Sequence, residues 1–130
     1  MNLPPHVPAH ATSFREALGR HLLAIEKRDL QTFADTVAEH GVLVVMSDGK
    51  LLRSKSEFVE AHRAWFATPG WTLHARQVEV VETADVGFGL FHLDYREPPA
   101  LRQESYLTLV FQRRGGKWLM VLDQNTPVKA

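Results

Sequence analysis

The second half of the chain contains four successive segments of strand-like composition that are separated only by short breaks. The segments span 71–82, 86–96, 104–113 and 117–125, and the breaks contain Thr83-Ala84-Asp85, Pro98-Pro99 and Gly115-Gly116. The Gly-Gly pair predicts a two-residue hairpin, because such turns need positive φ angles, which glycine adopts freely. Since short turns join antiparallel neighbours, this half of the sequence predicts a four-stranded antiparallel meander.

The first half of the chain has helical patterns instead. Ser13 with Glu16 has the spacing of a capping box, and so does Ser54 with Glu57. Between these two boxes, Asp29 is a typical N-cap for a shorter helix. Apolar residues recur at helical spacing after each cap, and the sequence therefore predicts three helices.

The order of these elements predicts an α+β fold. A short apolar run at 42–46, with a return at 51–52, adds a small hairpin between the second and third helices. The three N-terminal helices would pack on one face of a strongly curved, mainly antiparallel sheet, giving a cone. Gly87 and Gly89 within one strand are suitable places for that curvature.

Composition limits the classes of protein that need to be considered. A chain of 130 residues suits one domain, which we expect over 13–126, with a tail at 127–130. Residues 1–12 hold three of the seven prolines, which predicts a flexible arm. The 15 basic and 15 acidic residues argue against a nucleic-acid partner, and the lack of cysteine excludes disulfides. Without a membrane-length apolar run or a secretory signal pattern, a cytoplasmic protein with no membrane partner is expected.

Three local motifs of the chain resemble the NTF2-like superfamily. Residues 24–30, AIEKRDL, are similar to the helix junction of the family, with Arg28 in place of the usual glycine. Asp48-Gly49-Lys50 follows, and residues 113–121, RRGGKWLMV, are similar to its last hairpin. Over residues 13–126 the chain resembles the SnoaL-like branch and the related association domain of calcium/calmodulin-dependent kinase II.

This resemblance implies a cystatin/NTF2-like cone, with a pocket between the helices and the concave sheet face, and a homodimer. Ketosteroid isomerase-like members use a carboxylate base and a second acid on their strands. The matching positions here are about Val45 and Thr108 or Leu109, and the tyrosine of their oxyanion hole falls near His21. Steroid isomerase chemistry is therefore not expected.

The Gly-Gly hairpin also predicts which residues face the pocket. With Arg114 opposite Lys117, an unbroken register places Leu109 beside Leu122. By comparison with the family, this face is the concave one, and alternate residues 88–94 extend it on the neighbouring strand. Apolar walls with few polar groups are typical of small-molecule sites. The predicted ligand-binding residues are Phe58, His62, Trp65, Phe88, Leu90, Leu109, Leu122 and Gln124.

Three residues are candidates for acid/base catalysis. His92 and Asp94 share one strand face at i, i+2, so that the carboxylate would orient the imidazole. His21, beside the apolar face of the first helix, is the third candidate. For each of them a structural role is the open alternative, either a core histidine bonded to a carbonyl or a polar pair at the cone mouth. The histidines are too dispersed for a metal site, and no cofactor is expected.

Two functions remain open on this sequence. The first is binding of a small apolar or aromatic molecule in the cone, with any catalysis being cofactor-free isomerase, cyclase or lyase chemistry. The rival is a non-enzymatic assembly or regulatory module with a vestigial pocket. In either case, Val, Leu and Tyr residues on the second sheet face need a cover, which predicts a homodimer through the convex face.

Overall fold

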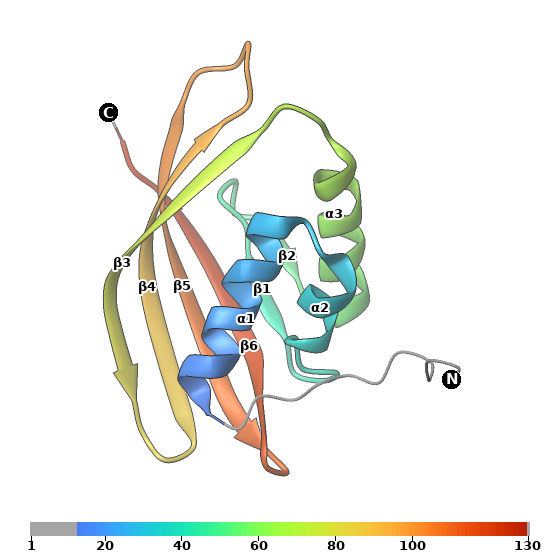
Figure 1. The fold of residues 1–130 in the computed structure, drawn as a ribbon, viewed down its shortest axis with the longest axis vertical. Coiled ribbons are helices and arrows are strands. Elements are labelled where there is room, and N and C mark those ends of the chain that lie inside the picture. Colours follow the sequence, from blue (N-terminus) through green and yellow to red (C-terminus); the bar gives the residue numbers. More distant parts are fainter. Residues whose placement is uncertain (1–12, 130) are drawn as a thin grey trace, which may run out of the picture.

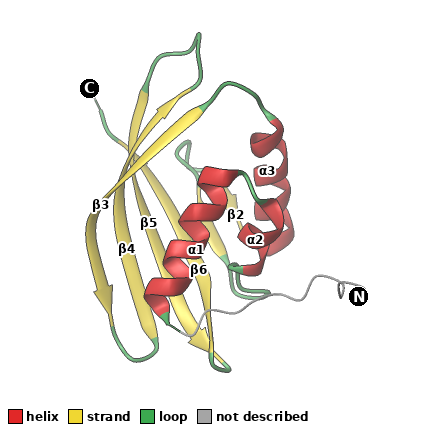
Figure 2. Ribbon diagram, viewed as in Figure 1, coloured by secondary structure: helices red, strands yellow, loops and turns green. Residues whose placement is uncertain are grey.

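Three helices lie on one side of a six-stranded sheet in the computed structural model, which describes residues 13–129 (Figure 1). The predicted arm at 1–12 lies outside the described residues. The elements follow the predicted order: α1 (Phe14–Lys27), α2 (Leu30–Asp35), β1 (Leu43–Val45), β2 (Leu51–Leu52), α3 (Lys55–Ala67), β3 (Thr72–Glu82), β4 (Val86–Arg96), β5 (Gln103–Arg114) and β6 (Lys117–Pro127). The α+β prediction is confirmed (Figure 2).

Each helix begins at the cap that the sequence predicts. Ser13 Oγ accepts a hydrogen bond from the backbone N–H of Glu16 at 3.1 Å, and Ser54 Oγ accepts one from Glu57 at the same distance. Asp29 Oδ1 accepts from the Thr32 N–H at 3.2 Å. These bonds satisfy backbone donors that the first helical turn leaves without partners.

The sheet has the strand order β2-β1-β6-β5-β4-β3. The long strands β3 to β6 form the predicted antiparallel meander, while β1 runs parallel to β6. The helices cover one face, which we call the concave face, and leave the opposite convex face without a helix (Figure 2). The largest fully buried side chains lie between the helices and the concave face, and they include Phe14, Phe33, Leu109, Phe111 and Met120.

Glycines in β4 determine which of its residues face the helices. A Cβ atom on Gly87 would lie 2.5 Å from the Phe14 ring, and one on Gly89 would lie 2.8 Å from the Phe91 ring. Gly87, Gly89, Phe91 and Leu93 are buried, so the odd-numbered positions of β4 belong to the concave face. The prediction that the even-numbered residues 88–94 face the pocket is therefore wrong. The sequence pattern did not determine the face, because apolar residues occupy both odd and even positions of this strand.

A β-bulge in β6 changes the predicted register as well. Phe111 pairs with Met120 as predicted, but Leu109 pairs with Asp123 instead of Leu122. Val121 is the additional residue, and it turns every later side chain of β6 to the other face. The unbroken register is therefore wrong beyond Met120, and Asp123 is buried on the concave side.

Candidate functional site

Two connected cavities lie between the helices and the concave face. The inner chamber has a volume of about 230 Å³, and the wider vestibule has a volume of about 820 Å³. Both cavities are lined by Met46, Ser47, Trp65, Leu73, Leu93 and Asn125. Because these side chains are shared, the vestibule gives access to the inner chamber.

Most side chains of the inner chamber are apolar. The helices contribute Ile25, Phe58 and Ala61, and the strands contribute Val44, Leu52 and Leu107. Its polar side chains are Ser47, His62, Asp123 and Asn125. This combination of an apolar wall with few polar groups is typical of a small-molecule site.

The Asp123 carboxyl group, in the wall of the inner chamber, has a strongly raised pKa. Its residue is 6% exposed, and burial raises its pKa to about 7, against the effect of a hydrogen bond from Asn125. Asn125 Nδ2 donates to Asp123 Oδ1 at 2.7 Å and to the Val45 carbonyl of β1 at 3.1 Å. Asn125 thus fixes the carboxyl group, which can be either an acid or a base near neutral pH.

His62 is a neutral part of the chamber wall. Its Nδ1 lies 3.0 Å from the Phe58 carbonyl, so the tautomer with the proton on Nδ1 satisfies both groups. Burial lowers the pKa of His62 to about 4, and the ring stacks on Phe33 with centroids 4.1 Å apart. In this tautomer Nε2 is a hydrogen-bond acceptor.

Trp65 lines both the inner chamber and the vestibule, and its ring is held in place by several contacts. Its Nε1 donates to Tyr95 Oη at 3.0 Å, and Tyr95 Oη donates to Glu97 Oε1 at 2.6 Å. The Trp65 ring also stacks on Trp71, with centroids 4.3 Å apart. A rigid aromatic wall of this kind is suited to contact with an apolar or aromatic ring.

His21, predicted as a catalytic candidate, lies in the core and lines neither chamber. Its Nδ1 is 2.7 Å from Thr36 Oγ1, whose hydroxyl donates to the Phe33 carbonyl at 2.6 Å. Burial lowers the pKa of His21 to about 3. Its Nε2 has no hydrogen-bond partner among residues 13–129. The alternative of a structural core histidine describes this environment better.

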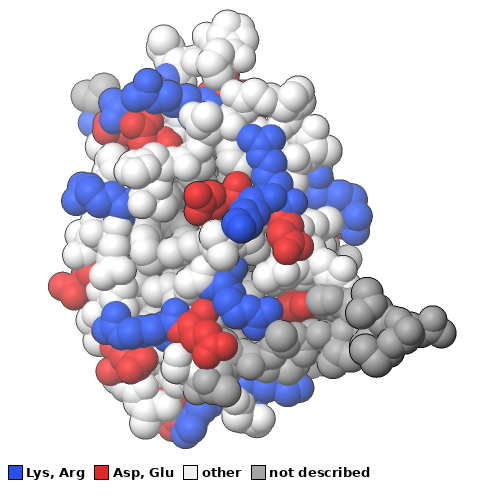
Figure 3. Space-filling model, in the orientation of Figure 1, with Lys and Arg blue, Asp and Glu red and all other residues white. Residues whose placement is uncertain are grey.

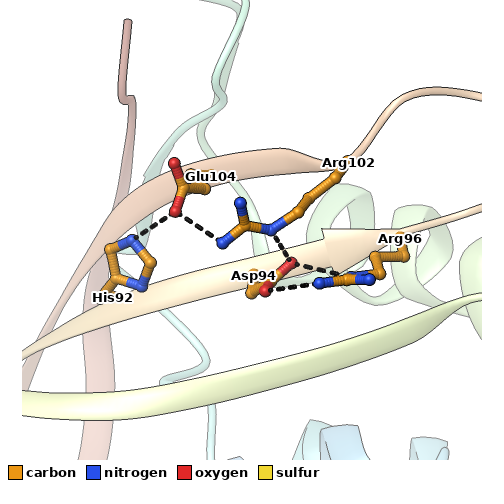
Figure 4. A network of polar contacts seen from close by, with 5 residues as sticks. All are labelled: His92, Asp94, Arg96, Arg102 and Glu104. Carbon is orange, nitrogen blue, oxygen red and sulfur yellow. Dashed lines mark hydrogen bonds and ion pairs between the residues drawn. The ribbon is translucent and has the colours of Figure 1, made fainter. Parts of the chain in front are cut away.

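His92 and Asp94, the other catalytic candidates, lie on the convex face because of the phase of β4 (Figure 4). His92 Nε2 is 3.4 Å from Glu104 Oε1, while Asp94 Oδ1 is 2.9 Å from Arg102 Nε. Hydrogen bonds from Arg96 and Arg102 lower the pKa of Asp94. The predicted pairing of His92 with Asp94 in the pocket is therefore wrong.

The predicted ligand-binding residues divide between the two faces. Phe58, His62 and Trp65 line the inner chamber, while Leu109 is fully buried in the core and lines neither chamber. The other four are on the convex face, because of the β4 phase and the β6 bulge: Phe88, Leu90, Leu122 and Gln124. Their placement in the pocket was wrong.

Ser47, Asp123 and Asn125 are polar residues of the inner chamber that the sequence did not predict. Asp123 and Asn125 follow five consecutive apolar residues, 118–122, so the sequence has no alternation there that would mark the bulge at Val121. Because the bulge contains no glycine, the usual signal for an irregular strand is absent.

Other classes of site find no support within residues 13–129. These residues contain no group of three or more His, Cys, Asp or Glu side chains that could hold a metal ion. None of the described helices is long and apolar enough to cross a membrane. On the molecular face in Figure 3, basic and acidic side chains are interspersed over the surface.

Solved structures with the same fold were found for nearly the whole chain. A candidate calcium/calmodulin-dependent protein kinase type II association domain from Thiobacillus denitrificans is 19% identical, with a TM-score of 0.79, covering 93% of this chain and 99% of that one. A candidate dehydratase of the NTF2-like family from Streptomyces avermitilis is 20% identical, with a TM-score of 0.74, covering 89% and 94%. A domain of unknown function with a cystatin-like fold from Nostoc punctiforme is 17% identical, with a TM-score of 0.74, covering 89% and 75%.

These similarities define the protein class as a cystatin/NTF2-like α+β fold, as the sequence predicts. Residues 15–124 match the SnoaL-like domain, and the chain belongs to that family. No match was found among curated proteins. The family hosts different activities on one fold, so function has to be argued from the chamber itself.

Proposed function

We propose that the protein binds a small apolar or aromatic molecule in the inner chamber and exchanges a proton with it through Asp123, without a cofactor. The observation that carries this proposal is a buried carboxyl group, with a pKa near 7, in the wall of an apolar cavity. General acid/base catalysis is most efficient when the pKa of the catalytic group is close to the working pH.

The contacts of Asp123 support a simple reaction cycle. Asn125 holds Oδ1, and Oδ2 makes no hydrogen bond within residues 13–129. As a carboxylate, Asp123 takes a proton from a carbon next to a carbonyl group of the ligand, and the ligand becomes an enolate. As a carboxylic acid, it then returns the proton to another atom of the ligand. Isomerisation, cyclisation and elimination all include such a transfer.

Deuterium exchange tests this proposal without knowledge of the product. Small cyclic and aromatic ketones are incubated with the protein in deuterated water, and deuterium uptake next to the carbonyl is followed by NMR. We expect uptake with the wild type and a loss of about a hundredfold with Asp123→Asn, the usual scale of acid/base catalysis. Asp85→Asn, which changes an exposed carboxylate that lines neither chamber, is the control.

Binding in the inner chamber with no exchange in either protein would favour the rival function, a binding or assembly module. That result would contradict the catalytic part of the proposal. Native mass spectrometry of the purified protein provides a second measurement, because a bound compound of small mass would identify the ligand directly.

We also propose that the protein is a homodimer through its convex face. Phe88 and Tyr106 on this face are 38% and 40% exposed in the single chain, and Leu90, Val110 and Leu122 beside them are only half-buried. An apolar sheet face without a covering helix is suited to the same face of a second copy. The similarity to an association domain supports oligomerisation.

A further inference from the structure

The inner chamber and the vestibule differ in the chemistry of their walls. Of the described residues that line the inner chamber alone, only His62 and Asp123 are polar. Most residues that line the vestibule alone are polar, namely Tyr95, Arg102, Gln103, Glu104 and Ser105. A ligand that fills both cavities would therefore pass from an apolar to a polar environment.

The charged side chains at the rim of the vestibule are turned toward the convex face, where they neutralise one another. Arg102 is the only cationic residue among the described residues that line it. Its Nε lies 2.9 Å from Asp94 Oδ1, and its Nη2 lies 2.8 Å from Glu104 Oε1 (Figure 4). Asp94 also contacts Arg96 at 3.4 Å. Because Asp94 and Glu104 are paired on the convex side of β4 and β5, they hold the Arg102 guanidinium group on that side, and an anionic ligand in the vestibule meets no free counter-charge.

The remaining hydrogen-bonding groups of the vestibule are neutral. The Ser47 and Ser105 hydroxyls and the Gln103 amide line this cavity, and none of them has a side-chain partner among residues 13–129. Hydroxyl and amide groups can both donate and accept hydrogen bonds. They suit a neutral polar group of a ligand and offer no counter-charge for an ion.

We propose that the natural ligand is a neutral molecule of two parts, an apolar or aromatic ring in the inner chamber and a hydroxyl- or amide-bearing group in the vestibule. This inference rests on the proposed function, because it takes the inner chamber as the binding site. A charged group in the vestibule would lose water without gaining a free counter-ion, and this cost excludes ligands with a carboxylate or phosphate at that end.

Three matched phenols test this inference: para-cresol, para-hydroxyphenylacetamide and para-hydroxyphenylacetate. They share the ring, and they differ in a methyl, an amide or a carboxylate at the far end. Affinities are measured at neutral pH by NMR titration of the amide-labelled protein. We expect the acetamide to bind about fivefold more tightly than the other two, the effect of roughly 1 kcal/mol from one neutral hydrogen bond. Its binding should shift the amide signals of Gln103 and Ser105.

Glu104→Gln tests the charge argument in the same assay. The substitution releases Arg102 from one of its carboxylates, so we expect the acetate to bind at least about threefold more tightly than it binds to the wild type. Glu60→Gln is the matched control, since Glu60 is exposed on α3, pairs with Arg63 and lines neither chamber.

The possible results separate this inference from the proposed function. Equal affinities for the three phenols, with shifts only in the inner chamber, would overturn the two-part ligand and leave the proposed function in place. Tighter binding of the acetate than of the acetamide to the wild type would overturn it too. If none of the phenols shifts any inner-chamber signal, the proposed function fails and the inference fails with it.

Discussion

At the scale of single residues, Asp123 couples proton uptake to folding. Burial raises its pKa from 3.8 to about 7, so between these pH values the folded chain keeps a proton that the unfolded chain has released. The contribution of Asp123 to the free energy of unfolding therefore falls as the pH rises from about 4 to about 7. We expect Asp123→Asn to be more stable than the wild type above that range, by on the order of 3 kcal/mol. Urea unfolding at about pH 5 and about pH 8 measures this difference.

His21 also makes the stability of the fold depend on pH, over nearly the same range but in the opposite direction. Because burial lowers its pKa from 6.5 to about 3, the unfolded chain takes up a proton first, and stability is lost as the pH falls through this range. Both proteins in the comparison contain His21, so their difference isolates the effect of Asp123. Asp85→Asn is the exposed control. An Asp123→Asn protein with the same pH dependence as the wild type would show that the carboxyl pKa is not raised.

At the scale of elements, the end of α1 depends on an arginine in a position that favours glycine. Arg28 has a φ angle of 57°, in the left-handed region. Its guanidinium group lies 3.9 Å from the centre of the Trp71 ring and donates to the Trp71 carbonyl at 2.7 Å. These contacts connect α1 to the segment between α3 and β3, and they offset the cost of the backbone conformation.

Two substitutions separate the backbone and side-chain effects of Arg28. Arg28→Ala keeps the strained φ angle and loses the contacts to Trp71, so we expect it to lose about 1–2 kcal/mol of stability. Arg28→Gly also loses the contacts but removes the strain, so it should lie between Arg28→Ala and the wild type. Thermal unfolding measures this order. Equal melting temperatures for the alanine variant and the wild type would contradict a stabilising role for the contacts.

The strands show how far sequence patterns predict a site. Caps, turns and the Gly-Gly hairpin are local signals, and they predicted the element order correctly. The faces of β4 and β6 depend on non-local contacts, namely the packing of Phe14 on Gly87 and the hydrogen bond from Asn125 to the Val45 carbonyl. A shift of one residue exchanges the two faces of a strand, so the local pattern could not place the buried acid.

At the scale of the whole molecule, the convex face determines the expected assembly. Phe88 on β4 pairs with Val110 on β5, and both side chains lie on the face without helices. We expect Phe88→Arg and Val110→Arg to convert the proposed dimer to a monomer, because either change would bury a charge without a partner in the interface. Light scattering over a range of protein concentrations measures the mass.

A third arginine substitution distinguishes the interface from general surface effects. Leu101 is 88% exposed in the loop between β4 and β5, away from the sheet face, so Leu101→Arg should remain dimeric. If Phe88→Arg and Val110→Arg both remain dimeric with unchanged stability, the subunits associate through another surface.

The position of β6 in the sheet has a consequence for synthesis on the ribosome. β6 is the last of the described strands, yet it lies between β1 and β5, and among these strands it alone joins the β1–β2 hairpin to the meander. It also carries Asp123, and the amide that orients this acid bonds to Val45 of β1. A nascent chain that has exposed the helices and the first five strands therefore has two unconnected pieces of sheet, and its Asp123 is not yet in place. The cone can close, and the proposed proton transfer can begin, only after β6 has left the exit tunnel.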